Sequence, residues 1–265
     1  MQWENLTSPD FARAVQETGV CILAFGVLER HADHLPLGTD FLNGHRIASL
    51  AAEREPAVVF PPFYFGQIYE ARCYPGAFTV PPTMLIELIQ AVFAEIGRNG
   101  FKKIILYNAH GGNVHLLPFL AQCALWEEKP HSLYYYTGGL SPAEQAERDA
   151  LLETDLHAHA CECETSTTLA NFPELVKMER VPAQPGQAQN RLKDLPENYS
   201  GIWWYGDFPE HYAGDARPAS AEKGRRLVEL DVQALARFIA AVKADSVVPG
   251  LEREFFERER KLRVR

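Results

Sequence analysis

The sequence has no apolar run near the roughly 18 residues that a membrane-spanning helix needs. It also begins without the charged and apolar segments of a secretory signal peptide. Its five cysteines are an odd number and no two have C-x-x-C spacing, so neither a disulfide framework nor a structural zinc finger is indicated. We therefore expect a cytoplasmic protein with reduced thiols and no membrane partner.

Basic residues are too few for a general nucleic-acid binder. The 26 Lys and Arg residues are outnumbered by 35 Asp and Glu residues, which gives a formal net charge of −9, whereas nucleic-acid binding needs a basic surface. Two catalytic signatures are missing as well. No G-x-G-x-x-G follows the first apolar run, which argues against a Rossmann-type oxidoreductase, and the absence of G-x-S-x-G argues against a serine hydrolase.

Apolar runs alternate with amphipathic stretches through the first half of the chain. The run "GVCILAFGV" at 19–27 is typical of a strand buried on both faces, and the apolar spacing in 81–100 predicts the clearest helix. Ser8 is the expected cap of a first short helix. Further strands are expected at 57–66, 132–138 and the start of 101–113, and further helices at 40–55, 114–128, 141–153 and 220–244. This alternation indicates an α/β fold with a mainly parallel sheet.

We expect a single domain over residues 1–265. Its segment at about 182–218 is too long and irregular for a simple connection, which indicates a functional or interface-forming insert. Within it, Trp203, Trp204 and Tyr205 either form the wall of a substrate pocket, in this or an adjoining subunit, or simply pack the segment onto the domain.

Three polar clusters lie at 29–40, 108–113 and 157–166. Ligands of doubly wound sheets bind at the carboxyl ends of the strands, so we expect these clusters to converge there. The first cluster holds five metal-capable side chains: Glu29, His31, Asp33, His34 and Asp40. Carboxylates combined with neutral imidazoles suit Zn²⁺, Mn²⁺ or Fe²⁺, and two acids with two histidines are typical of a hydrolytic metal centre.

Individual residues in these clusters also have structural explanations. Asp40 stands at a helix start, where the helix dipole favours an ionised carboxylate that can bridge two cations, but it could simply cap the helix. His110 is followed by two glycines, which let the backbone approach a ligand or form a tight turn. Glu164 is a further carboxylate at an expected helix entry. The metal hypothesis therefore depends on the joint occurrence of these residues.

Three segments carry a family resemblance. "ERHADHLPLGTD", "NAHGGN" and "HACECETS" resemble, in order and at similar separations, the signature segments of the creatininase (creatinine amidohydrolase) family. "GDFPEHYAGDARPASAEKG" is a weaker match to its C-terminal segment. The resemblance implies a three-layer α/β/α fold and two divalent ions, Zn²⁺, Mn²⁺ or Fe²⁺. It also implies hydrolysis of a non-peptide or unusual C–N amide bond in a small molecule, commonly by a homohexamer.

The resemblance assigns roles to individual residues. Glu29 and His110 would bind one metal, His31 would bind the other, and Asp40 would bridge the two. His159 matches the histidine that donates a proton beside the substrate in the creatinine enzymes.

The sequence departs from the family at the second cluster. Creatinine hydrolases carry H-Y-E-N there, with the glutamate as a metal ligand, whereas this chain has His110-Gly111-Gly112-Asn113. Glu164 is the expected replacement ligand for the second metal. Broader family members with H-G-G-N deformylate a pyrimidine nucleotide precursor or cleave a modified peptide, so creatinine is one candidate substrate among several.

The implied reaction is attack of a metal-activated water on an amide carbon. Glu164 or Glu162 would shuttle the proton, and His159 would donate it to the leaving nitrogen. Cys161 and Cys163 are expected to be small core thiols, with a place near the metals as the alternative. A non-catalytic or degenerate metal-binding member of the same fold remains the alternative to an enzyme.

Overall fold

The structure, a computed structural model, describes residues 1–136, 138–195 and 199–263. Its central sheet is parallel, has the order β2-β1-β3-β4, and consists of β1 (Val20–Phe25), β2 (Val58–Val59), β3 (Lys103–Asn108) and β4 (Ser132–Tyr136). Every residue of β1 is buried, as its continuous apolar run predicts. Phe25 pairs with Asn108, so the carboxyl ends of β1 and β3 lie side by side.

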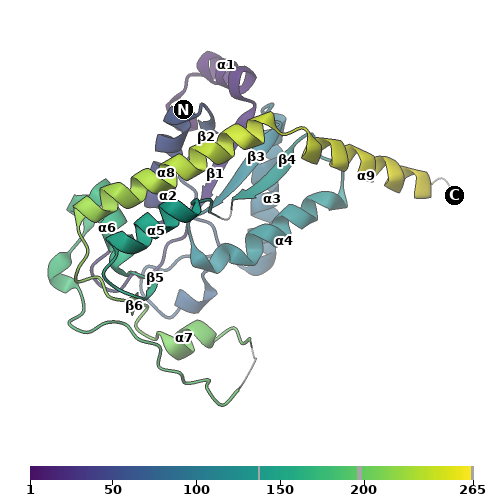
Figure 1. Cartoon of the computed structure of the whole chain (residues 1–265). Helices are drawn as coiled ribbons and strands as arrows, with labels where there is room; N and C mark the ends of the chain where they lie inside the picture. The colour runs from purple at the N-terminus through teal and green to yellow at the C-terminus, as the bar shows by residue number, and fades with distance from the viewer. Residues whose placement is uncertain (137, 196–198, 264–265) are drawn as a thin grey trace.

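Helices cover both faces of the sheet and confirm the three-layer α/β/α arrangement (Figure 1). Val20, Ile22 and Ala24 of β1 belong to the core beneath α2 (Thr39–Arg54) and α8 (Ala221–Ala244). The intervening residues of β1 belong to the core on the other face, with α1 (Ser8–Thr18), α3 (Pro82–Arg98) and α4 (Leu116–Cys123). Because successive strand side chains point to opposite faces, one apolar run supplies two cores.

Two local expectations differ from the structure. The cap of α1 is Thr7, whose hydroxyl accepts a hydrogen bond from the Asp10 amide at 3.4 Å, and Ser8 is already helical. The strand expected at 57–66 is reduced to β2, because Pro61 and Pro62 have no N–H to donate to a ladder. Beyond them the chain makes only an isolated bridge between Phe63 and Phe25.

Most of the remaining elements come from the second half of the chain. A two-stranded antiparallel sheet pairs β5 (His157–His159) with β6 (Ala213–Gly214). The remaining helices are α5 (Pro142–Leu151), α6 (Glu162–Asn171), α7 (Trp203–Asp207) and α9 (Val247–Arg263). Short 3-10 helices lie at Trp3–Asn5, Tyr69–Ala71, Gly111–Val114, Ala124–Trp126, Pro173–Leu175 and Met178–Arg180. The segment expected to be irregular, about 182–218, thus holds α7 and β6, while the helix expected at 220–244 is α8.

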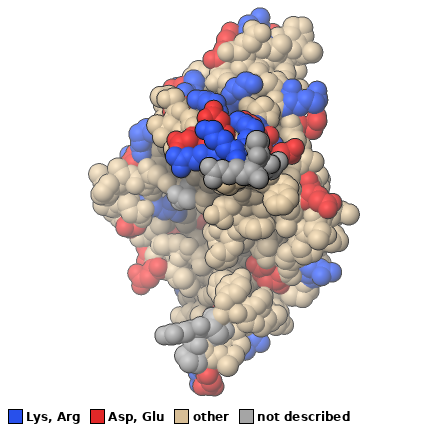
Figure 2. Space-filling model, turned by 90° about the vertical axis from the view of Figure 1, so that its right-hand side faces the viewer, with Lys and Arg blue, Asp and Glu red and all other residues tan. Residues whose placement is uncertain are grey.

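The face of the molecule on the side of α9 carries charges of both signs. α9 extends away from the sheet in Figure 1, and Figure 2 looks from that side. On this face, Lys and Arg side chains are interspersed with Asp and Glu side chains. Among the described residues, no helix is both long enough and apolar enough to cross a bilayer.

Candidate metal centre

The six residues predicted as metal ligands or catalytic groups lie together at the carboxyl ends of β1 and β3. They are Glu29, His31, Asp40, His110, His159 and Glu164. They arrive from the loop after β1, the first turn of α2, the loop after β3, the end of β5 and the start of α6. All are buried except Glu164, whose side chain is 33% exposed. Their ligand atoms form three groups, each within 4.8 Å.

The first group joins Glu29, Asp40 and His110. Nδ1 of His110 lies 2.8 Å from Glu29 Oε1 and 2.8 Å from Asp40 Oδ2. The other ring nitrogen, Nε2, donates to the Gln67 carbonyl at 2.9 Å. In the neutral ring Nδ1 is therefore unprotonated and carries a lone pair. This lone pair faces two carboxylate oxygens that receive no hydrogen bond. With the ring neutral, three electron-rich atoms converge with no proton between them, an arrangement that fits a cation.

The second group uses the other oxygen of Asp40. Nε2 of His31 lies 2.9 Å from Asp40 Oδ1 and 3.9 Å from Glu164 Oε2. Nδ1 of His31 donates to the Glu29 carbonyl oxygen, which lies 3.3 Å away. In the neutral ring, Nε2 therefore carries the free lone pair. The two oxygens of Asp40 therefore each face a different imidazole, as a bridging ligand requires.

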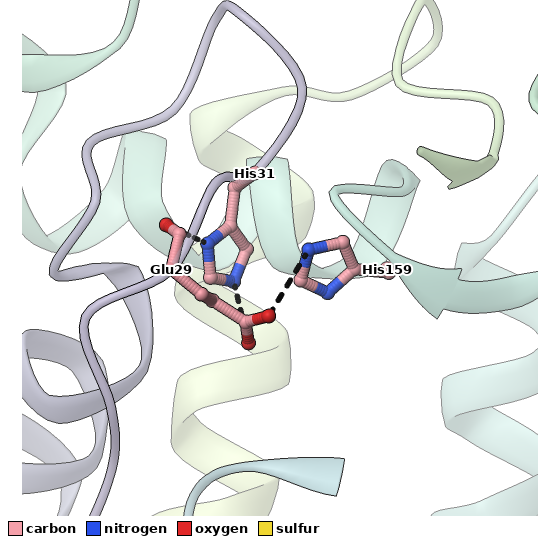
Figure 3. Close-up of side chains that lie close together, drawn as sticks. All are labelled: Glu29, His31 and His159. Carbon is pink, nitrogen blue, oxygen red and sulfur yellow. Dashed lines mark hydrogen bonds and ion pairs between the residues drawn. The ribbon is translucent and has the colours of Figure 1, made fainter. Parts of the chain in front are cut away.

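His159 lies beside the other two groups rather than between them. Its ring stacks on that of His31, with centroids 4.2 Å apart, and its Nε2 lies 3.8 Å from Glu29 Oε2 (Figure 3). Nε2 donates to the Arg30 carbonyl at 2.8 Å. Burial lowers the pKa of His159 to about 3, against the opposing effect of Glu29, so the ring is neutral.

The charges of the cluster also suit a cation. Burial would lower the pKa of His31, but Asp40 and Glu29 raise it to about 10, and Glu29 and Asp40 likewise hold the pKa of His110 well above its usual value. Burial raises the pKa of Glu164 to about 7. The buried carboxylates of Glu29 and Asp40 therefore favour protons on both imidazoles. A divalent ion would displace those protons.

Two of the metal-capable side chains in 29–40 lie outside these groups. Asp33 is exposed and pairs with Arg30 at 3.1 Å. His34 is buried, and its Nε2 lies 2.9 Å from the hydroxyl of Thr165, which ties this loop to α6. Burial lowers the pKa of His34 to about 4.

The residues near Glu164 separate into different environments. Glu162 is fully buried, and its carboxylate accepts from the amides of Glu153 and Thr154 and from Lys223 Nζ at 2.5 Å. These bonds place Glu162 in a structural network apart from the three metal-capable groups. Cys161 is a buried core thiol, as expected, whereas Cys163 accepts from Arg148 at 3.1 Å and lines a cavity with Glu164.

The second glycine of "HGGN", Gly112, has a steric reason. A Cβ atom at Gly112 would lie 2.5 Å from Nε2 of His110 and 2.7 Å from the Gln67 carbonyl oxygen. The side chain of Asn113 accepts from the Gln67 amide at 2.9 Å, so both flanking residues bind the segment at Gln67. The loop is therefore built around a glycine where the creatinine enzymes carry their glutamate.

Sequence reasoning missed His211. Its Nε2 lies 3.0 Å from Glu29 Oε2, although 182 residues separate the two in the chain. The indole of Trp204 donates to its Nδ1 at 3.3 Å. The weak match at 206–224 was the one signal in this region, and it does not single out a histidine.

An open cavity of about 310 Å³ adjoins the cluster. Asp40, His110 and Glu164 line it together with Arg148 and Asp231. A second cavity of about 560 Å³ shares the last two residues. Trp204 lines neither, and packs instead against Phe208, His159 and His211.

The sequence model described as creatinine amidohydrolase matches residues 4–239. The chain belongs to the creatininase family. Among curated proteins, the chain is 27% identical to creatinine amidohydrolase of Pseudomonas putida over 240 residues, which cover 85% of this chain and 90% of the relative. It is 28% identical over 245 residues to 3-dehydro-scyllo-inosose hydrolase of Thermotoga maritima, covering 86% and 78%.

Solved creatininases have the same fold. One crystal structure of creatinine amidohydrolase superposes with a TM-score of 0.79 at 24% identity, covering 92% of this chain and 98% of the other. Solved forms include a manganese creatininase and a Zn–Zn variant, each with a TM-score of 0.78. The predicted family and its three-layer fold are thus confirmed, and the curated relatives are hydrolases.

Proposed function

We propose that this chain is a metal-dependent amidohydrolase that hydrolyses a non-peptide or cyclic C–N amide bond of a small molecule, creatinine or a related amide or formamide. The observation that carries the proposal is the pair of imidazole lone pairs facing the two oxygens of Asp40. The donor set suits two divalent ions, Zn²⁺, Mn²⁺ or Fe²⁺.

The ligands follow from the two groups. Glu29, His110 and Asp40 Oδ2 would hold one ion, and His31, Glu164 and Asp40 Oδ1 the other. When bound, such a pair supplies a water of lowered pKa and polarises a carbonyl oxygen. Backbone carbonyls fix the orientation of both imidazoles, so these ligands are preorganised by the chain itself.

His159 and Glu164 are the candidate proton-transfer groups. His159 shares its Nε2 proton with the Arg30 carbonyl and lies 3.8 Å from Glu29 Oε2, and its neutral ring would pass that proton to a leaving nitrogen only while taking up another at Nδ1. Glu164 accepts from the Ala160 amide at 2.5 Å and lines the open cavity, so it meets both solvent and the cluster. Without a bound ion, burial raises the pKa of Glu164 to about 7, whereas a divalent ion at this carboxylate would favour the ionised form, which can accept a proton.

The alternative is a degenerate metal-binding protein without turnover, and the glycine at 112 favours it because one ligand of the creatinine enzymes is absent. Elemental analysis of chelator-free protein, followed by a panel of small amides, separates the two. About two metal equivalents per chain with turnover supports the hydrolase. About one equivalent without turnover supports the degenerate protein, and none after incubation with Zn²⁺, Mn²⁺ or Fe²⁺ overturns both.

We also propose that residues 1–265 form one cytoplasmic domain that assembles as a homohexamer without nucleic-acid or membrane partners. Support for assembly comes from large apolar side chains left on the surface, above all Trp126, which is 90% exposed. Light scattering on the purified protein tests the assembly, and a monomer at micromolar concentration would contradict it.

A further inference from the structure

His211 combines complete burial with an unfavourable backbone conformation. Its φ is 51°, in the left-handed region that non-glycine residues rarely occupy, and its side chain is 1% exposed. Ala32 and Ala160, which follow His31 and His159 in the chain, also have positive φ, and the Ala32 amide donates to the His211 carbonyl at 3.1 Å. Strain of this kind persists where the surrounding contacts impose it, and here it is concentrated beside the metal cluster.

The hydrogen bonds of His211 define the tautomer of its neutral ring. An indole N–H can only donate, so Nδ1 of His211 must accept from Trp204. In the neutral ring the proton is then on Nε2, which donates to Glu29 Oε2 at 3.0 Å. The other oxygen of Glu29, Oε1, is thereby left to face Nδ1 of His110.

The segment that carries His211 is itself held in place. The ring of Tyr74 lies 5.0 Å from the imidazole, and its hydroxyl donates to the Pro209 carbonyl. Trp204 packs against Phe208, with ring centroids 4.8 Å apart. The segment that carries the imidazole is therefore fixed in position. This packing excludes water from the side of the Glu29 carboxylate that His211 contacts.

We infer that His211 is a positioning residue that orients Glu29 for metal binding, and that Trp204 sets its tautomer. The inference rests on the proposed function, because it takes Glu29 to be a ligand. Outer partners of metal ligands typically affect metal affinity by about 10–100-fold. We expect an effect of this size on the ion shared by Glu29, His110 and Asp40, and a smaller one on the ion bound through His31.

The test measures Zn²⁺ affinity of the full chain by competition with a chelating dye. His211→Leu keeps the size and the backbone strain but removes the donor, and should weaken one Zn²⁺ site by about 10–100-fold. His211→Gln offers an amide N–H near the position of Nε2 and should recover most of that affinity. Trp204→Phe keeps an aromatic ring without its N–H and should give an intermediate loss. His157→Leu, at an exposed histidine of β5, is the matched control and should bind Zn²⁺ like wild type.

The outcomes separate this inference from the proposed function. Wild type that binds neither Zn²⁺ nor, in the same competition assay, Mn²⁺ or Fe²⁺ overturns both. Wild type that binds two ions, together with His211→Leu of unchanged affinity, overturns only the role of His211. Equal losses in the Leu and Gln variants would mean that the imidazole acts by packing rather than by its hydrogen bond, which also overturns it. A thermal midpoint measured without metal shows whether any loss reflects the fold, since the Leu and Gln variants carry the same strain.

Discussion

Asp40 meets His31 through one carboxylate oxygen only: Oδ1 lies 2.9 Å from Nε2 of His31, and Oδ2 is left for His110. The two oxygens of one side chain thus belong to two different ligand groups. Glu29 is also shared, since its Oε1 faces His110 and its Oε2 faces His159, but of these groups it is Asp40 that joins the one with His110 to the one with Glu164. Asp40 is therefore the side chain whose loss should affect both ions at once.

Asp40→Asn should reduce Zn²⁺ affinity at both positions by more than about 100-fold, which exceeds the loss usual for an outer partner. Turnover of any amide substrate should fall with it. Asp33→Asn is the control, because Asp33 is an exposed carboxylate of the same loop. Metal content by elemental analysis is the readout, and an Asp40→Asn protein that retains two equivalents would contradict the bridging assignment.

Glu162 and Glu164 should respond in opposite ways to removal of their charge. Glu164→Gln should lose one ion with little change in stability, because Glu164 faces the cavity. Glu162→Gln should keep both ions but lower the free energy of unfolding by about 1–3 kcal/mol, since it weakens buried hydrogen bonds to Lys223 and to two backbone amides. Metal content and urea unfolding of both variants test the contrast, and the reverse pattern would show that the two roles are exchanged.

The network of Glu162 also predicts an acid-dependent stability. Burial alone would raise the pKa of this carboxyl, but hydrogen bonds from Lys223 and Thr154 outweigh it and lower the pKa below the usual value. Its contribution to stability is therefore complete above the unfolded-state pKa of about 4.3 and is lost as the pH falls through the lower folded-state pKa. In urea unfolding of chelator-treated protein, the difference between wild type and Glu162→Gln should shrink as the pH drops from neutral to about 3. A difference that stays constant over this range would contradict the shift.

The residues that gather at the carboxyl ends of the strands were predictable because they belong to short, local sequence motifs. "NAHGGN" directly follows the apolar run of β3, so the position of His110 depends on few residues between strand and loop. The spacing of Glu162 and Glu164, by contrast, could not assign their roles. Residues two apart in a helix point in different directions, and only the packing of α6 against α8 decides which of them meets Lys223.

His211 illustrates what sequence patterns cannot supply. Its contact with Glu29 joins segments 182 residues apart, and its positive φ is uncommon for residues other than glycine. The shortening of β2 was foreseeable in kind, since Pro61 and Pro62 restrict a strand, but not in extent. Long-range side-chain contacts and the exact ends of strands depend on tertiary packing, which local propensity does not encode.

Gly112→Glu should fail to restore the missing ligand of the creatinine enzymes. A Cβ atom at this position would lie 2.7 Å from the Gln67 carbonyl oxygen, so the loop must shift to accept any side chain. Overpacking of this kind costs about 1–3 kcal/mol, and the shift would also disturb His110. Gly111→Glu is the matched control, because a Cβ atom there meets nothing within 4 Å. Thermal unfolding and metal content decide: a Gly112→Glu protein as stable as Gly111→Glu, with tighter metal binding, would show that the loop can accommodate the ligand.

Arg148 should act on substrate binding rather than on the chemical step. Its guanidinium donates to Cys163 Sγ at 3.1 Å and lies 3.8 Å from Asp231 Oδ1, beyond hydrogen-bond distance, so donors remain free in the cavity beside Glu164. A polar group on the part of the substrate that does not react would find them there. Arg148→Met keeps much of the side-chain volume and should raise KM by about 10-fold, the loss of one hydrogen bond to a charged group, with kcat little changed.

The control for Arg148 is Arg226→Met, which removes an arginine that pairs with Glu147 on the surface. It should leave both constants unchanged. Steady-state kinetics on the best substrate of the amide panel provides the measurement. If Arg148→Met lowers kcat and leaves KM unchanged, the guanidinium contributes to the transition state instead, and the cavity beside Glu164 is not where the unreacting part of the substrate binds.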